Sequence, residues 1–154
     1  MMNTKKNTYE ELRLENQLCF PLYACAKEVV RQYRKPLQKL NLTYTQYIVM
    51  MVLWEYGSMT EGQLGEIIHL DSGTLAPLLK RLEHSGYINR TRLEHNERKL
   101  LVSLTEEGRQ LQEKAKSVPD AMRKCIPLEG EELMMLRDLL NRALNAMDRE
   151  GKSK

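Results

Sequence analysis

The stretch from Leu70 to Thr105 constrains the fold of this chain more than any other segment. In its first half, leucines recur at helical spacing and form one apolar face, while small and basic residues occupy the opposite face. Asp71 or Ser72 can cap the start of this helix, and Ser85-Gly86 is a typical stop signal. Two β-suited runs follow at residues 87–92 and 99–104, separated by a polar tip. The segment therefore predicts a helix followed by a β-hairpin.

Charge is unevenly distributed around this segment. Residues 72–99 contain six Lys or Arg against three Asp or Glu, whereas residues 59–71 contain three acids and no Lys or Arg. Just upstream, Thr60-x-x-Gln63 is a capping box that opens a shorter helix. Two short helices followed by a basic hairpin are typical of a helix-turn-helix with a wing, which binds DNA. The alternative is an amphipathic helix packed on a hairpin whose charges are merely solvated.

Length and composition exclude several classes of protein. The 154 residues suit one domain, and 42% hydrophobic and 29% charged residues are ordinary for a globular protein. A net charge of +3 is too small to indicate nucleic acid by itself. No apolar run approaches the ~20 residues of a membrane span, and the polar N-terminus is unlike a signal peptide. We therefore expect a cytoplasmic protein without a membrane partner. The three cysteines have no metal-ligand spacing, so we expect no metal or other cofactor.

An apolar stripe from Leu18 to Tyr33 predicts a first long helix that ends near Lys35-Pro36. Pro21 is tolerated in the first turn of a helix but costs ~3 kcal/mol in its interior, so the helix either starts near Cys19 or kinks at the proline. If it starts there, free backbone N–H groups and the positive end of the helix dipole would stabilise a Cys19 thiolate. From the residues alone, a buried and unreactive cysteine is the simpler interpretation.

The remaining helices are marked by their caps and apolar spacing. Thr43-x-x-Gln46 is a capping box for a second helix, and Thr105 can cap a fifth, which Pro119 breaks or bends. The buried candidates of the second helix are Tyr47, Val49, Met50, Met51, Leu53 and Trp54. After Pro127, leucines and methionines recur in threes and fours, which is typical of a coiled-coil seam. We expect the terminal helices to form a two-fold dimer, since this would place two recognition helices ~34 Å apart, matching successive major grooves.

This order of elements resembles the MarR family of winged-helix repressors. More narrowly, LENQLCFPLY, LTYTQYIVMMVLWE, LDSGTLAPLLKRLE and NERKLLVSLTEEG resemble its organic-hydroperoxide-sensing branch, and the resemblance covers about residues 14–144. It implies a mainly α fold with a small β-hairpin wing, in one domain over residues 1–154. A winged helix-turn-helix lobe would span about residues 43–105, between dimerisation helices at about 10–36 and 108–150. The implied partners are a second copy of the chain and double-stranded DNA with an inverted-repeat operator.

The resemblance also implies a sensor. Cys19 matches the peroxidatic cysteine, whose thiolate an organic hydroperoxide oxidises to a sulfenic acid, lowering operator affinity and derepressing peroxide-resistance genes. Tyr33 and Tyr44 match tyrosines that hydrogen-bond this sulfur from the partner subunit, and Tyr23 matches a further tyrosine nearby. We expect an apolar pocket to favour organic hydroperoxides over hydrogen peroxide, and its expected lining is Phe20, Leu22 and Tyr47.

The expected DNA-binding residues lie on the recognition helix and the hairpin, and they are Ser72, Thr74, Pro77, Lys80, Arg81, Arg90, Arg92 and Arg98. The first three match residues that enter the major groove in the family, and Arg98 lies in the wing, which reaches the minor groove. Here Asn96-Glu97-Arg98 stands where the family usually has Asp-x-Arg. Asparagine cannot form the ion pair that would orient the arginine.

The fate of an oxidised Cys19 depends on the other cysteines. Cys25 is about 9 Å of rise and 240° of rotation away on a helix, so these two cannot form a disulfide. Some members of the branch carry a resolving cysteine in the region of Cys125 and form an intersubunit disulfide, so the resemblance implies a resolving role for Cys125. The alternative is that a low-molecular-weight thiol caps the oxidised Cys19.

Two other functions stay open from the sequence. One is a regulator of the same fold that responds to a phenolic ligand, and the other is a thiol peroxidase-like enzyme. No Cys-x-x-Cys is present, and the three histidines lie away from Cys19 in the chain, so we expect no enzymatic activity.

Overall fold

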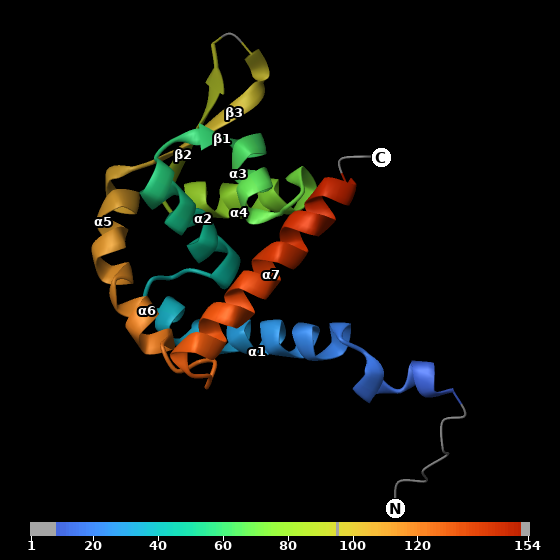
Figure 1. Ribbon diagram of the computed structural model, residues 1–154. Coiled ribbons are helices and arrows are strands. Elements are labelled where there is room, and N and C mark those ends of the chain that lie inside the picture. The colour runs from blue at the N-terminus through green and yellow to red at the C-terminus, as the bar shows by residue number, and fades with distance from the viewer. Residues whose placement is uncertain (1–8, 95, 152–154) are drawn as a thin grey trace, which may run out of the picture. The chain divides into compact units, whose positions relative to one another are not determined.

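A computed structural model describes residues 9–94 and 96–151, without the side chains of residues 97, 98 and 149–151 (Figure 1). Its elements in chain order are η1 (Glu10–Leu12), η2 (Leu14–Asn16), α1 (Cys19–Gln38), α2 (Tyr44–Tyr56), β1 (Met59–Thr60), α3 (Glu61–Ile68), α4 (Ser72–His84), β2 (Ile88–Leu93), β3 (Asn96–Leu104), α5 (Glu106–Ala115), α6 (Ser117–Met122) and α7 (Gly130–Gly151). The chain divides into two compact units, Met1–Arg123 and Lys124–Lys154. The fold is mainly helical with a small wing, as the sequence predicted.

Helix α1 starts at Cys19, which places Pro21 in the first turn, where a missing N–H costs little. The prediction that the helix ends near Lys35-Pro36 is wrong, because it continues through Pro36 to Gln38. A proline in the last turn removes one backbone hydrogen bond, and the next residue, Leu37, is buried in the core. Burial of that leucine compensates for the missing bond.

Capping chemistry fixes the starts of α2 and α3. The hydroxyl of Thr43 accepts a hydrogen bond from the Gln46 amide, and the Gln46 side chain accepts one from the Thr43 amide. Thr60 and Gln63 form the same reciprocal pair at the start of α3. Both capping boxes are confirmed, and each satisfies two backbone donors that the helix itself leaves free.

Helices α3 and α4 form the helix-turn-helix. Between them, His69 adopts a left-handed conformation with φ 54°, and the Leu70 amide donates to the Gly65 carbonyl at 3.0 Å. Asp71 caps α4, accepting from the Thr74 amide at 2.9 Å. The four leucines on one face of α4 are all buried, and they are Leu75, Leu78, Leu79 and Leu82. Their burial leaves the opposite face of α4 at the surface.

The wing is larger than predicted. Strand β3 begins at Asn96, three residues before the expected start, and pairs with β2 in antiparallel register (Figure 1). Met59–Thr60 forms a third strand, β1, on the other edge of β3, so the strand order is β1-β3-β2. Two residues are too short to show an alternating pattern, and this strand becomes recognisable only from its partner.

One core holds the elements of the first unit together. Its largest fully buried side chains come from α1, α2, α3, α4, α6 and the two long strands, and they are Leu37, Met50, Leu53, Leu64, Leu75, Leu79, Leu82, Ile88, Val49, Val102 and Val118. Thr105 caps α5 as predicted, accepting from the Gly108 amide at 3.0 Å. The helix then breaks at Lys116, because Pro119 has no N–H to donate to the carbonyl of Ala115.

The second unit contains α7, a single long helix. Among the described residues 130–148 of this helix, none is buried, although many are leucine or methionine. Met134, Met135, Leu139 and Met147 are each more than half exposed. Exposed leucines and methionines in this number are typical of a helix that is covered by another chain.

Candidate nucleic-acid interface and cysteine site

The exposed face of α4 carries the predicted recognition residues. Thr74, Pro77 and Arg81 lie on the side opposite the buried leucines, Lys80 flanks them, and Ser72 is exposed in the first turn. The face has hydroxyl groups near its N-terminus and cations further along, which are groups that can contact base edges and phosphates. The structure therefore brings these five predicted residues together on one helix.

Thr74 and Asp71 form a local unit at the start of this face. Besides the capping bond, the Thr74 hydroxyl donates to Oδ2 of Asp71 at 2.8 Å. These bonds from Thr74 hold the pKa of the Asp71 carboxyl below its ordinary value, because they stabilise the charged form. The Thr74 hydroxyl is thereby oriented by the cap, with its oxygen available as an acceptor.

The predicted arginines of the hairpin lie in different environments. Arg92 is exposed and forms no ion pair with any side chain that the structure describes. The side chain of Arg98 lies outside the described residues. Arg90 is only 11% exposed and is bound by the carboxylates of Glu61 and Glu83. Its guanidinium is engaged within the lobe, whereas that of Arg92 is not paired with any described side chain.

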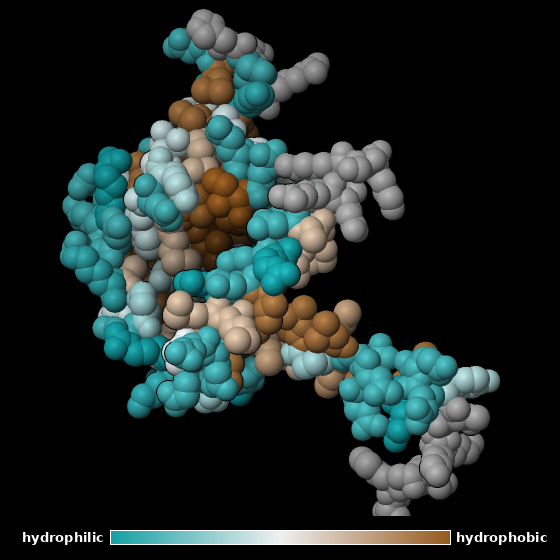
Figure 2. All heavy atoms as spheres, in the orientation of Figure 1, coloured by the Kyte–Doolittle hydropathy of each residue, from teal (hydrophilic) through white to brown (hydrophobic). Residues whose placement is uncertain are grey.

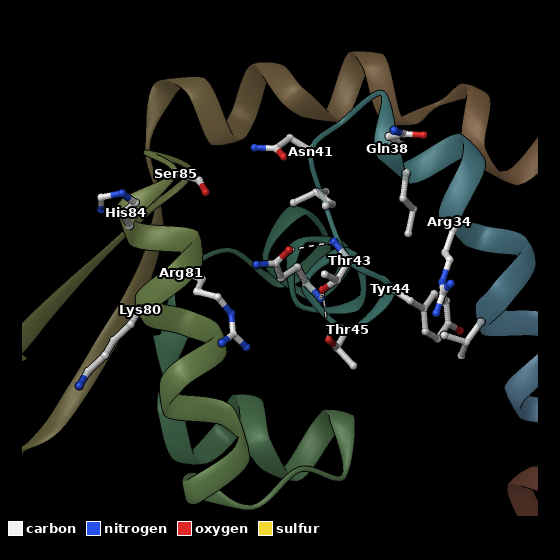
Figure 3. Close-up of a pocket in the computed structure, with 14 residues that line it drawn as sticks. Arg34, Gln38, Asn41, Thr43, Tyr44, Thr45, Lys80, Arg81, His84 and Ser85 are labelled. Carbon is white, nitrogen blue, oxygen red and sulfur yellow. Dashed lines mark hydrogen bonds between the residues drawn. The ribbon is translucent and has the colours of Figure 1, made fainter.

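A groove of about 970 Å³ lies between the end of α1, the first turn of α2 and α4 (Figure 3). Arg81 extends from α4 toward the first turn of α2, while Arg34 from α1 lies on the other side of that turn beside Tyr44. Lys80 and His84 complete a basic lining that contains no acid. Arg34 could not be identified from the sequence, because its neighbours in this groove come from separate segments.

Cys19 is the first residue of α1 and is exposed. Leu18, the preceding residue, provides no side-chain cap, so backbone N–H groups of the first turn are free to stabilise a negative charge. Phe20 lines a hollow of about 600 Å³ together with Leu12, Leu14 and the charged Arg13 and Glu15. Figure 2 shows hydrophobic side chains at the surface along this end of α1. The thiol therefore lies beside apolar surface.

The expected pocket of Phe20, Leu22 and Tyr47 is not formed within one chain. Tyr47 is buried at the other end of α1, with its ring centroid 6.0 Å from Tyr33 and 6.3 Å from Trp54. Burial, with a smaller effect from Tyr44, raises the pKa of the Tyr47 hydroxyl.

Tyr33 and Tyr44 form a close pair, with ring centroids 4.6 Å apart. Tyr33 is 14 residues beyond Cys19 on one continuous helix, which corresponds to ~21 Å of rise. A hydrogen bond from either tyrosine to the Cys19 sulfur of the same chain is therefore impossible. Tyr23 lies one turn from Cys19 on α1, is exposed, and its ring faces the Lys27 ammonium at 5.8 Å.

The three cysteines are free thiols. Cys25 is exposed on the same unbroken helix as Cys19, which agrees with the prediction that these two cannot be bridged. Cys125 is partly exposed and belongs to the second unit. Among the described residues, no group of three or more His, Cys, Asp or Glu could hold a metal ion, and none of the helices combines the length and apolarity that crossing a bilayer requires.

Comparison with known proteins gives relatives along nearly the whole chain. A family model described as transcriptional regulator SarA/Rot matches residues 31–115. The organic hydroperoxide resistance transcriptional regulator of Bacillus subtilis (strain 168) is 43% identical over 146 residues, covering 95% of this chain and 99% of that protein. The HTH-type transcriptional regulator SarZ of Staphylococcus saprophyticus is 37% identical over 144 residues, covering 94% and 95%.

Solved structures show the same architecture. Reduced AbfR bound to DNA is 37% identical, covers 90% of this chain and 96% of its own, and superimposes with a TM-score of 0.73. Overoxidized AbfR bound to DNA gives the same identity and TM-score, covering 90% and 97%. Both structures match over nearly their full lengths, so the similarity includes the terminal helices as well as the lobe.

Proposed function

The chain belongs to the SarA/Rot and MarR-type winged-helix transcriptional regulators, in the organic hydroperoxide resistance branch, and on this premise we propose that it is a redox-sensing DNA-binding repressor. Oxidation of Cys19 by an organic hydroperoxide would lower its affinity for operator DNA and release peroxide-resistance genes. In this proposal the protein acts in the cytoplasm, where it reaches the DNA. Each Cys19 reacts with one molecule of peroxide and is not regenerated by the protein itself, so the protein is a regulator and not an enzyme.

The exposed face of α4 supports DNA as the partner. Helix α4 is held by four buried leucines, so its outer residues form a rigid surface that includes Ser72, Thr74 and Pro77. Lys80 and Arg81 follow on the same side, and the exposed Arg92 lies on the hairpin. We infer that the α4 residues enter the major groove and that Arg92 contacts a phosphate.

The observation that carries the sensor proposal is the separation of Cys19 from the tyrosine pair. Tyr33 and Tyr44 form one unit at the far end of α1, ~21 Å along the helix from the thiol. In a two-fold dimer with antiparallel α1 helices, the start of one α1 lies beside the end of the other. The exposed apolar side chains of α1 support such contact between copies. We propose that each Cys19 is hydrogen-bonded by the tyrosines of the other copy.

The chemistry at Cys19 follows from a thiolate at a helix start. The sulfur attacks the terminal oxygen of the hydroperoxide, the O–O bond breaks, and the alkoxide takes a proton and leaves as an alcohol. The hydroxyl oxygen stays on the sulfur as a sulfenic acid. The hollow lined by Leu12, Leu14 and Phe20, together with the charged Arg13 and Glu15, would hold the hydrocarbon part of an organic hydroperoxide against its apolar side chains.

Cys125 would complete the switch. Attack of its thiolate on the sulfenic sulfur forms a disulfide between copies and releases hydroxide, which takes a proton to give water. The relative AbfR was solved bound to DNA in an overoxidized form and, separately, in a disulfide form. We therefore propose that the disulfide, rather than oxidation of one sulfur alone, displaces the recognition helices. A hundredfold loss of affinity needs only ~2.7 kcal/mol of difference between the two states.

The basic groove beside α4 is the place where the ligand-responsive alternative would bind its ligand. Arg34 and Arg81 lie on opposite sides of the first turn of α2, and either guanidinium would pair with the carboxylate of a small aromatic acid (Figure 3). A ligand bound there would contact the recognition helix and could alter DNA affinity without cysteine chemistry. The two functions differ in their dependence on Cys19.

Fluorescence anisotropy on the DNA upstream of the protein's own gene tests the proposal. Reduced wild type and Cys19→Ser should both bind this DNA, and one equivalent of cumene hydroperoxide should release only the wild type. Loss of binding in both proteins would contradict the role of Cys19. Tight binding that ignores peroxide but falls with salicylate would favour the groove instead, and no binding would contradict DNA binding at this promoter.

A further inference from the structure

Arg90 lies where three elements of the first unit meet. Its Nε and Nη2 atoms are both 2.8 Å from Oε1 of Glu61, at the start of α3. Its Nη1 atom is 3.6 Å from Oε2 of Glu83, near the end of α4. The Glu61 side chain is 22% exposed and that of Glu83 is 41% exposed. One guanidinium therefore joins both helices of the helix-turn-helix to the first long strand of the wing.

The main chain of the same residue is held as well. The backbone N–H of Arg90 donates to Oε1 of Glu83 at 3.1 Å. Strand β2 lies at the edge of the sheet, where outward N–H groups have no neighbouring strand to accept them. Glu83 therefore accepts a hydrogen bond from the main chain of Arg90 and forms an ion pair with its side chain.

Glu83 occupies a position that electrostatics otherwise disfavours. It lies in the last turn of α4, where the negative end of the helix dipole favours cations such as Arg81. It also lies on a lobe that binds a polyanion, where an additional carboxylate repels phosphate. Its contacts with Arg90 account for a carboxylate that neither the helix nor the DNA would favour.

We propose that Arg90 is a positioning residue for DNA binding, which fixes the wing against the recognition helix without touching DNA. This inference rests on the proposed DNA-binding function. Arg92 lies two residues further along β2 and therefore on the same face, and it is exposed. The two arginines contribute to affinity by different routes: Arg92 through a phosphate, and Arg90 through the geometry of the wing.

The decisive comparison is between Arg90→Gln and Arg92→Gln, which remove the same charge from one face of one strand. Affinity for the promoter DNA is measured by anisotropy over a series of salt concentrations. Arg92→Gln should lower the slope of log K against log salt by about 0.9 for each phosphate that the arginine neutralises. Arg90→Gln should weaken binding about tenfold with the wild-type slope. An unchanged affinity, or a slope reduced as in Arg92→Gln, would overturn the proposal.

Glu61→Ala tests the same ion pair with the opposite sign of charge. Removing an acid from a DNA-binding lobe strengthens DNA binding if net charge alone matters, but weakens it if Glu61 holds Arg90 in place. In the Arg90→Gln background, Glu61→Ala should have little further effect, because both substitutions break the same ion pair. Stronger binding by the single variant would contradict the positioning role.

Amide hydrogen exchange of the free dimer separates this inference from the proposed function. Arg90→Gln should accelerate exchange along β2, whereas Arg92→Gln should leave it at the wild-type rate. If wild-type protein bound no DNA, the proposed function would fail, yet exchange in β2 would still decide the role of Arg90. Equal exchange in all three proteins would refute the role of Arg90 in holding the wing against the helices.

Discussion

Substitution of Gly65 by alanine tests the geometry of the helix-turn-helix. Gly65 is buried in α3, and a Cβ atom at this position would lie 2.7 Å from the Leu70 carbonyl oxygen. Ordinary van der Waals contact begins at 3.4 Å, so the two segments would have to separate by about 0.7 Å. The Leu70 amide donates to the Gly65 carbonyl at 3.0 Å, so the turn cannot rotate away without breaking this bond.

Two opposing effects set the expected magnitude. Overpacking of this kind costs about 1–3 kcal/mol. Alanine is favoured over glycine in a helix by up to ~1 kcal/mol, which offsets part of that cost. We expect a net decrease of about 1–2 kcal/mol in the free energy of unfolding, which lowers Tm by roughly 4–8 °C for a unit of this size.

Gly62→Ala is the matched control, three residues earlier on the same helix. Its Cβ atom would meet only the Thr60 hydroxyl oxygen, at 4.0 Å. This variant gains helix propensity without strain, so its Tm should stay unchanged or rise by a few degrees. Thermal unfolding followed by circular dichroism measures both. If the two variants shift Tm equally, the close approach of α3 to Leu70 is refuted.

Three further predictions concern the cap of α4, the Trp54 indole and the Cys125 thiol. Thr74→Val should raise the pKa of Asp71 toward its ordinary value, which NMR titration measures. A carboxyl whose pKa is lower in the folded than in the unfolded state stabilises the fold above the unfolded-state pKa, and this stabilisation is lost as the pH falls through the folded-state pKa. The loss of stability on acidification should therefore be smaller in the variant. Trp54→Phe should cost about 1 kcal/mol in denaturant unfolding, because the indole N–H donates at 2.9 Å to a carbonyl of α5. Cys125→Ser should leave oxidised protein monomeric on a non-reducing gel and bound to DNA, whereas a covalent Cys19 dimer in this variant would disprove the resolving role.

Local chemistry was predictable because it is contained in a few consecutive residues. The caps at Thr43, Thr60, Asp71 and Thr105 each need only a short side chain and an amide three residues later, and all four form as expected. The start of α1 at Cys19 was one of two alternatives that Pro21 allowed, and the structure selects the unkinked one.

Burial on α2 was only partly predictable, because this helix is apolar on nearly every side. Tyr47, Val49, Met50 and Leu53 are buried as expected, but Val52 is buried where Met51 was expected. Periodicity identifies a face only where polar residues mark its opposite side, and α2 has too few of them.

Partners that are distant in sequence were not predictable. Arg90 and Arg92 look equivalent in a basic strand. Only the folded chain shows that Glu61 and Glu83, which are 29 and 7 residues from Arg90 in the sequence, bind Arg90. Arg34 joins the groove for the same reason, since its neighbours lie on α2 and α4. Sequence patterns give the charge of such residues, whereas their partners depend on the tertiary fold.

The central claim is that Cys19 of one copy is sensitised by Tyr33 and Tyr44 of another, and mixed dimers test it most directly. The double variant Tyr33→Phe/Tyr44→Phe is mixed with an excess of Cys19→Ser protein, and the rate of Cys19 sulfenic acid formation with cumene hydroperoxide is measured by trapping with dimedone and mass spectrometry. The double variant alone should react slowly, and the mixture should restore the wild-type rate, because the Cys19→Ser copy supplies both tyrosines. A rate that stays slow in the mixture would contradict a sensor site built from two copies.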